Sequence, residues 1–243
     1  MAIDATFVAE AFSSSGANID TVWTPSANTT YLAIYAWTVT NPSGQLGPTT
    51  PTLPSGSGNI GSGPTQISLN NTSTHNWFHG IEIWKMKAVA SPSGTTTFRC
   101  PSDVNGQGKT AVFALSGEGA FASLKVQEKK SATDSPASLT LDAGTSTNNL
   151  LLTFYNFDED TLGNITGGEG TEIWDSTTDP HLAVYKRTAS TSTTVAIPTT
   201  SGSGTLVNIT ALELLASGAA AAIRLEGGVT RLGLEGGSGY LAL

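Results

Sequence analysis

The sequence is poor in cysteine and in charged residues. Cys100 is the only cysteine among 243 residues, which excludes a disulfide within the chain and a metal site built from several cysteines. Only 12% of the residues are charged, whereas globular domains usually contain about 25%. Glycine, serine and threonine take the place of the charged residues. This composition suits short strands joined by tight turns, and a surface that contacts other protein or sugar.

Basic residues and long apolar runs are also scarce. The formal net charge is −8 and the isoelectric point about 4.7, which argues against a nucleic-acid partner because such proteins gather lysine and arginine. No stretch reaches the ~20 apolar residues of a membrane-spanning helix. Residues 1–6 contain neither a basic nor an apolar segment of the kind that opens a secretory signal peptide. We therefore expect neither membrane nor nucleic acid as a partner.

Alternating residues in one stretch predict a β-strand. Residues 77–99 read WFHGIEIWKMKAVASPSGTTTFR, in which apolar and other side chains alternate with a period of two before a Ser-Pro-Ser-Gly turn. A similar order returns in residues 181–197. We interpret both stretches as hairpins. Neither alternating set of the first is polar throughout, so either both of its faces contact protein or one face lays a lysine stem along apolar surface.

Further strands favour an antiparallel β-sandwich, jelly-roll-like, of one domain over residues 1–217. Residues 5–12 place Phe7, Ala9 and Ala11 on one face of a first strand. Residues 31–39 and 149–157 are apolar on both faces, as central strands are. Residues 41–64 are rich in proline and glycine and predict a long loop, which either packs on the sandwich or a neighbouring chain, or faces a ligand.

The end of the chain is an internal repeat of nine residues. From Ile223 it reads IRLEGGVTR, LGLEGGSGY, LAL, so short apolar strands alternate with Gly-Gly turns. A sheet this small is not stable alone, and we expect the tail, residues 218–243, to dock on a partner or to join protomers. The predicted assembly residues are Ile223, Leu225, Leu232, Leu234, Leu241 and Leu243.

No arrangement of side chains predicts catalysis. The three histidines, His75, His79 and His181, are expected at the surface, and no serine lies in a nucleophile motif. Residues 158–179 hold most of the local acidity, and oxygen ligands such as Asp158, Asp160 and Glu169 suit Ca²⁺, although the spacing of a known calcium loop is missing. The sequence therefore predicts a protein that is not an enzyme and has no cofactor.

Tryptophans offer a second candidate site. Five are present, and two of them, Trp37 and Trp84, lie in apolar strands and are expected in the core. Trp77 and Trp174 lie closer to loops and are the candidates for a rim that stacks on sugar rings.

Three motifs carry a resemblance to a known group of proteins. They are EIWKMKAVASPSGTTTF, the later TEIWD…HLAVYKRTAS…TTV, and the terminal Leu-Glu-Gly-Gly repeats. Together they resemble uncharacterised β-sandwich proteins of tailed bacteriophages and prophages. The resemblance implies a virion structural protein, a capsid decoration or tail-associated protein made in the host cytoplasm, whose partners are other virion proteins and copies of itself. The alternatives are a module that binds a host surface glycan and, third, an enzyme that cleaves glycans.

Overall fold

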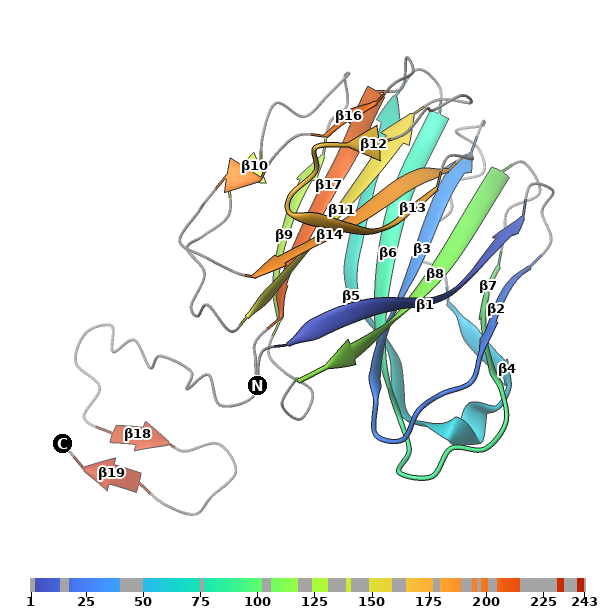
Figure 1. Ribbon diagram of the computed structural model, residues 1–243, viewed down its shortest axis with the longest axis vertical. Coiled ribbons are helices and arrows are strands. Elements are labelled where there is room, and N and C mark those ends of the chain that lie inside the picture. The colour runs from blue at the N-terminus through green and yellow to red at the C-terminus, as the bar shows by residue number, and fades with distance from the viewer. Residues whose placement is uncertain are drawn as a thin grey trace.

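The computed structural model is an antiparallel β-sandwich with a third layer on one face (Figure 1). It describes residues 3–13, 18–39, 50–74, 77–101, 106–117, 124–130, 139–140, 149–158, 165–176, 180–188, 194–195, 198–200, 205–214, 231–233 and 240–242. Every strand pairing among these residues is antiparallel. The predicted all-β antiparallel class is confirmed.

Two five-stranded sheets form the sandwich, and each comes from one half of the chain. The first sheet has the order β1 (Asp4–Ser13), β8 (Gly106–Ser116), β3 (Thr30–Val39), β6 (Trp77–Ala88) and β5 (Ile60–Thr74). The second has the order β13 (Thr171–Ser176), β14 (His181–Thr188), β11 (Leu150–Asp158), β17 (Thr205–Leu214) and β9 (Leu124–Lys130). This division by halves differs from a jelly roll, in which strands alternate between the two sheets.

One apolar cluster joins the two sheets. Ile34 and Ile83 of the first sheet and Phe154 and Val184 of the second belong to it, and all four side chains are fully buried. Their burial follows from the period of two, because every second residue of each strand faces the opposite sheet. The core therefore unites both halves of the chain. The predicted domain boundary after residue 217 lies outside the described residues.

A three-stranded sheet covers the other face of the first sheet. It has the order β2 (Ile19–Trp23), β7 (Thr96–Cys100) and β4 (Thr52–Ser55). A second cluster fills the space between them and includes Tyr35, Trp37 and Phe98. The strands β3 and β6 are thus buried on both faces, as their sequences predict. Trp37 and Trp84 lie in this core, which confirms that part of the prediction.

The predicted hairpin over residues 77–99 is wrong. β6 pairs with β3 and β5, whereas β7 pairs with β2 and β4 in the third layer. The turn between β6 and β7 carries the chain from one layer to the next. The side chain of Asn59, which is distant in the sequence, is hydrogen-bonded to the backbone of this turn. The Asn59 side chain donates to the Ser93 carbonyl at 3.1 Å and accepts from the Ser93 N–H at 2.8 Å.

The second predicted hairpin is wrong for a similar reason. β14 pairs with β11 and β13, while β15 (Thr194–Val195) pairs with β10 (Leu139–Thr140). The remaining short strands are β12 (Ile165–Thr166) with β16 (Thr199–Thr200), and β18 (Arg231–Gly233) with β19 (Tyr240–Ala242).

The stretch that predicted a long loop is partly regular. Within residues 50–64 lie β4, a short 3₁₀-helix, η1 (Ser57–Asn59), and the start of β5. β4 pairs with β7 of the third layer, so these residues pack on the sandwich, as the first of the two alternatives expected. Residues 41–49 lie outside the described part. No helix among the described residues is long and apolar enough to cross a membrane.

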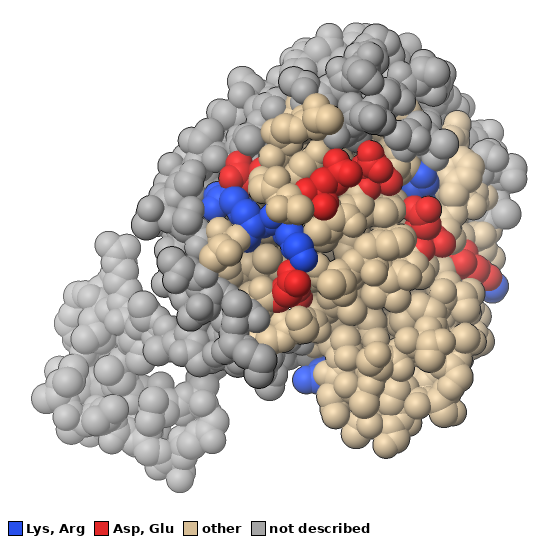
Figure 2. Space-filling view, in the orientation of Figure 1, with Lys and Arg blue, Asp and Glu red and all other residues tan. Residues whose placement is uncertain are grey.

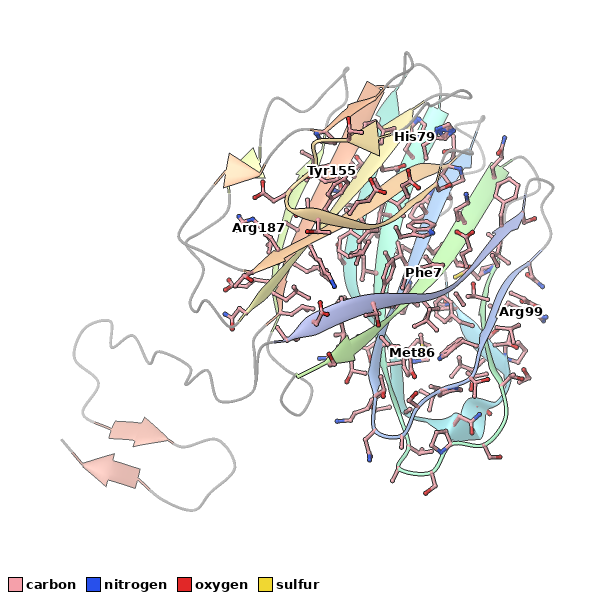
Figure 3. All side chains as sticks on the ribbon, in the orientation of Figure 1. Phe7, His79, Met86, Arg99, Tyr155 and Arg187 are labelled. Atoms are coloured by element: carbon pink, nitrogen blue, oxygen red, sulfur yellow. The ribbon has the colours of Figure 1, made fainter. Side chains whose placement is uncertain are left out.

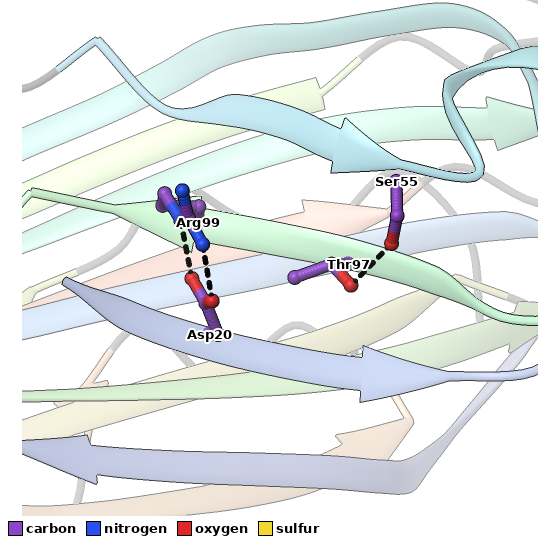
Figure 4. Close-up of polar contacts among 4 residues, drawn as sticks. All are labelled: Asp20, Ser55, Thr97 and Arg99. Carbon is purple, nitrogen blue, oxygen red and sulfur yellow. Dashed lines mark hydrogen bonds and ion pairs between the residues drawn. The ribbon is translucent and has the colours of Figure 1, made fainter.

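The outer face of the third layer has a single ion pair. Arg99 donates from Nε and Nη2 to the two carboxylate oxygens of Asp20, both at 2.6 Å (Figure 4). These bonds from Arg99 lower the pKa of Asp20. Beside them the hydroxyls of Ser55 and Thr97 are hydrogen-bonded at 2.7 Å. Asp20 and Arg99 are the only charged residues in the sequences of β2, β4 and β7.

Candidate interaction surface

The strand β1 leaves apolar side chains in contact with solvent. Phe7 is 40% exposed, Val8 37% and Phe12 47%. Among the described residues β1 is the edge strand of its sheet and has β8 as its one strand partner. Single exposed apolar residues are normal on protein surfaces, but three on one edge strand single this strand out as a candidate contact surface. We call Phe7, Val8 and Phe12 the β1 patch.

A β-bulge in β1 places these side chains. The register with β8 shifts between Phe7 and Ala9, so Val8 is the extra residue. After such a bulge the alternation reverses. Ala9 and Ala11 therefore pack towards the third layer, on the opposite side from Phe7. The expectation that Phe7, Ala9 and Ala11 share one face is wrong because the sequence does not reveal the bulge.

The edges of the two sheets meet beneath this patch. The Phe7 ring stacks on the Trp174 indole of β13, with ring centroids 6.1 Å apart and an interplanar angle of 10°. The Trp174 Nε1–H donates to Glu10 Oε2 at 2.8 Å. Lys186 of β14 donates to Asp4 Oδ1 at 2.6 Å and to the Ala5 carbonyl at 2.9 Å. Figure 3 shows Phe7 on β1, between this strand and β13 in the view.

Trp174 is a core residue and not a rim residue. Its side chain is 8% exposed and belongs to the central apolar cluster. A sugar stacks on an open ring face, and the Trp174 indole is stacked against the Phe7 ring and meets the Phe113 ring edge to face. The other rim candidate, Trp77, has its backbone in β6, and its side chain lies outside the described residues.

The acidic residues of this region have separate partners. Glu169 forms an ion pair with Arg187, and Glu172 accepts a hydrogen bond from the Tyr185 hydroxyl at 2.8 Å. Asp158 ends β11 with its backbone opposite Thr205, while its side chain, and all of Asp160, lie outside the described residues. Within the described part no group of three or more histidine, cysteine or carboxylate side chains could hold a metal ion. Of the three calcium candidates, Glu169 is thus committed to an arginine.

The glycine-rich segment before β13 folds over two tyrosines. The Glu169 N–H donates to the Tyr155 hydroxyl at 3.0 Å, and the rings of Tyr155 and Tyr185 meet edge to face at 5.7 Å. A Cβ at Gly168 would lie 2.6 Å from the Tyr185 ring, so only glycine fits there. Burial raises the pKa of Tyr155 and of Tyr185 well above the ordinary value. These hydroxyls stay protonated and serve as structural hydrogen-bonding groups.

Two of the predicted surface histidines are buried. His79 and His181 are both 0% exposed, which corrects the expectation, while His75 lies outside the described residues. Burial, and then the charge of Lys109, lower the pKa of His181 to about 4. Cys100 is buried as well. Burial raises the pKa of its thiol, and the Glu82 carboxylate adds to the effect, so this cysteine is a poor nucleophile.

Of the predicted assembly residues in the tail, the structure describes Leu232 and Leu241, which lie in one short strand pairing. β18 and β19 are antiparallel partners in which Leu232 lies opposite Leu241. These are equivalent positions of the nine-residue repeat. Ile223, Leu225, Leu234 and Leu243 lie outside the described residues.

Charge is unevenly spread over the face that carries β1. Figure 2 shows acidic and basic side chains in a band over the upper part, while the region over β2, β4 and β7 is free of charge except at its border. Interface cores are depleted of charged residues in the same way. The features that the sequence did not reveal here are the bulge at Val8 and the resulting patch.

The comparisons with known proteins give no match. No family model, no curated protein and no solved structure is similar to this chain.

Proposed function

We propose that the chain is a structural protein of a tailed-phage particle, a capsid decoration or tail-associated protein, that acts by protein–protein assembly. The observation that supports this proposal best is the β1 patch. Phe7, Val8 and Phe12 are three of the four large apolar side chains that are exposed among the described residues. A patch of this kind on an otherwise well-packed sandwich is typical of a surface that another protein covers.

Two further observations support assembly. The third layer carries only the Asp20–Arg99 pair on its strands, so it can meet a protein surface without burying unpaired charge. The pairing of Leu232 with Leu241 agrees with a tail made of short repeated strands. The buried Trp174 removes one of the two side chains on which a glycan-binding function was based.

The test is to find the chain in purified particles. Particles released by lysis would be separated on a density gradient, and the ratio of this chain to the major capsid protein would be measured by quantitative mass spectrometry. We expect the chain to follow the particles at a fixed ratio. Recovery of the chain only in the soluble fraction would overturn the proposal.

A further inference from the structure

Two asparagines lie opposite each other inside the sandwich. Asn156 of β11 and Asn208 of β17 are direct partners in the antiparallel register, and both are 0% exposed. The amide nitrogen and oxygen of each have no hydrogen-bond partner within the part of the chain that the structure describes. Together these two side chains offer two NH₂ donors and two carbonyl acceptors.

Both side chains face the space between the two sheets. Leu152 and Phe154 point into the central core, and Asn156 continues their alternation. On the neighbouring strand β17, Leu212 and Leu214 belong to the same core. Asn208 is an even number of residues away from them and therefore lies on the same face of the sheet. The register shift of β11 against β17 comes only after Asn156, so it does not disturb this alternation.

Polar residues surround the asparagine pair and end the apolar core. At one side Asn70 of β5 donates to the Ile209 carbonyl and to Thr210 Oγ1, both at 3.1 Å. At the other side Lys109 of β8 donates to Ser176 of β13. These hydrogen bonds connect the two sheets on either side of the asparagine pair.

The opposite sheet is polar at the same end. His79 Nδ1 and Thr38 Oγ1 lie 3.3 Å apart, two residues beyond Ile81 and Ala36, which are level with Asn70 and Lys109. Figure 3 shows His79 at this end of β6.

Leaving these groups unpaired would be costly. A buried polar group without a partner costs about 1–3 kcal/mol, and native proteins pair more than about 90% of them. The guest that pairs them must be small, because the amide atoms are enclosed, and it must both donate and accept. Water meets both conditions, and internal waters typically make about three hydrogen bonds to such groups.

We propose that Asn156 and Asn208 form a built internal hydration site between the two sheets, which binds ordered water. The water completes the hydrogen bonding of both amides and links them to the polar residues of the facing sheet. The site favours this pairing of β11 with β17, because a slip of either strand by one residue would turn its asparagine out of the polar layer and towards the outer face of the sheet.

The direct test is to detect the water in the full-length protein by NMR. We expect nuclear Overhauser effects from long-lived water to the side-chain NH₂ groups of Asn156 and Asn208. Amide protons of Leu152, which lies in the apolar part of β11, serve as the internal control and should show none. Absence of these effects at both asparagines would overturn the proposal.

Substitution gives a second, independent readout. Leucine has the same branching as asparagine but no polar atoms. If water pairs the amides, Asn156→Leu and Asn208→Leu alone each leave a polar partner behind, and each should lower the folding equilibrium constant about fivefold or more. The double variant removes both partners and should recover most of the loss. If instead the amides are dry and unpaired, each single variant should raise the constant, which would contradict the proposal.

A matched control is available on the same strand. Thr153 is buried in β11, and its hydroxyl has no hydrogen-bond partner among the residues that the structure describes, but by alternation it lies on the opposite face. Thr153→Val should leave the water signals of both asparagines unchanged. If a variant does not fold, the NMR measurement on the unaltered protein still decides the question.

Discussion

Trp174 lies flat against Phe7, with an interplanar angle of 10°, and this contact joins the edge of one sheet to the edge of the other. The indole also meets the Phe113 ring edge to face at 6.2 Å. Trp174 thus holds three chain segments together: β1, β8 and β13.

Replacing this tryptophan should lower the free energy of unfolding. Trp174→Ala removes the packing against both rings and should cost about 3–5 kcal/mol. Trp174→Phe retains most of the packing, loses the hydrogen bond to Glu10, and should cost about 1–2 kcal/mol. Urea denaturation measures both. If Trp174→Ala unfolded at the same urea concentration as the unaltered protein, the indole would not be the core residue described here.

Gly80 should not tolerate a side chain. It lies opposite Trp37 in the register of β6 with β3, and a Cβ there would come within 2.1 Å of the Trp37 ring. Gly80→Ala should therefore destabilise the protein by about 1–3 kcal/mol or more. The matched control is Gly58→Ala, where a Cβ meets nothing within 4 Å. Equal unfolding midpoints for the two variants would contradict the close contact between Gly80 and Trp37.

His181 should make stability depend on pH. Its pKa is about 4 in the folded protein, against an ordinary value of 6.5, because burial and then Lys109 disfavour the charged ring. Between these values the unfolded chain binds a proton that the folded chain does not, so stability falls as the pH is lowered from 6.5 towards 4. Unfolding near pH 5 should take up close to one extra proton through this residue. Denaturation at several pH values measures that uptake.

The control for this effect is His181→Gln, which keeps a polar side chain but cannot titrate. The variant should lose the uptake while the contribution of carboxylates such as Asp20 remains. Identical pH profiles for the two proteins would contradict a neutral, buried His181.

The tail should contribute to self-association. Leu232 and Leu241 are partners in the register of β18 with β19, and a charge at both positions would place like charges on adjacent strands. We expect light scattering to give an oligomer for the unaltered chain and a smaller mass for Leu232→Asp/Leu241→Asp. A monomer in both cases would show that the tail does not join copies of this chain.

The sequence predicts local structure here better than long-range pairing. The alternation over β6 and the apolar strands β3 and β11 identified the buried strands correctly, because burial on both faces leaves a visible pattern. The same stretches suggested hairpins, and these were wrong. Asn59, far away in the sequence, holds the turn before β7, and no local signal reveals such a partner.

The candidate sites show the same limit. Trp174 looked like a rim residue because it follows an acidic, glycine-rich stretch, yet the edge strand β1 covers it. The β1 patch was hidden because a bulge at Val8 reverses the alternation. His181 and Asn156 could not be recognised as buried polar groups, since a single polar residue at a strand end is usually exposed.

The most direct test of the proposed function is binding to particles assembled without this chain. Purified full-length protein would be mixed with such particles, and the bound fraction would be measured by sedimentation. We predict saturable binding for the unaltered chain and for Val22→Ser, whose exposed valine lies in the third layer. Val8→Ser/Phe12→Ser, which removes two of the three side chains of the β1 patch and keeps Phe7 on Trp174, should bind at least about tenfold more weakly, a loss of about 1.4 kcal/mol. Equal binding by the patch variant, or no binding by the unaltered chain, would contradict assembly through β1.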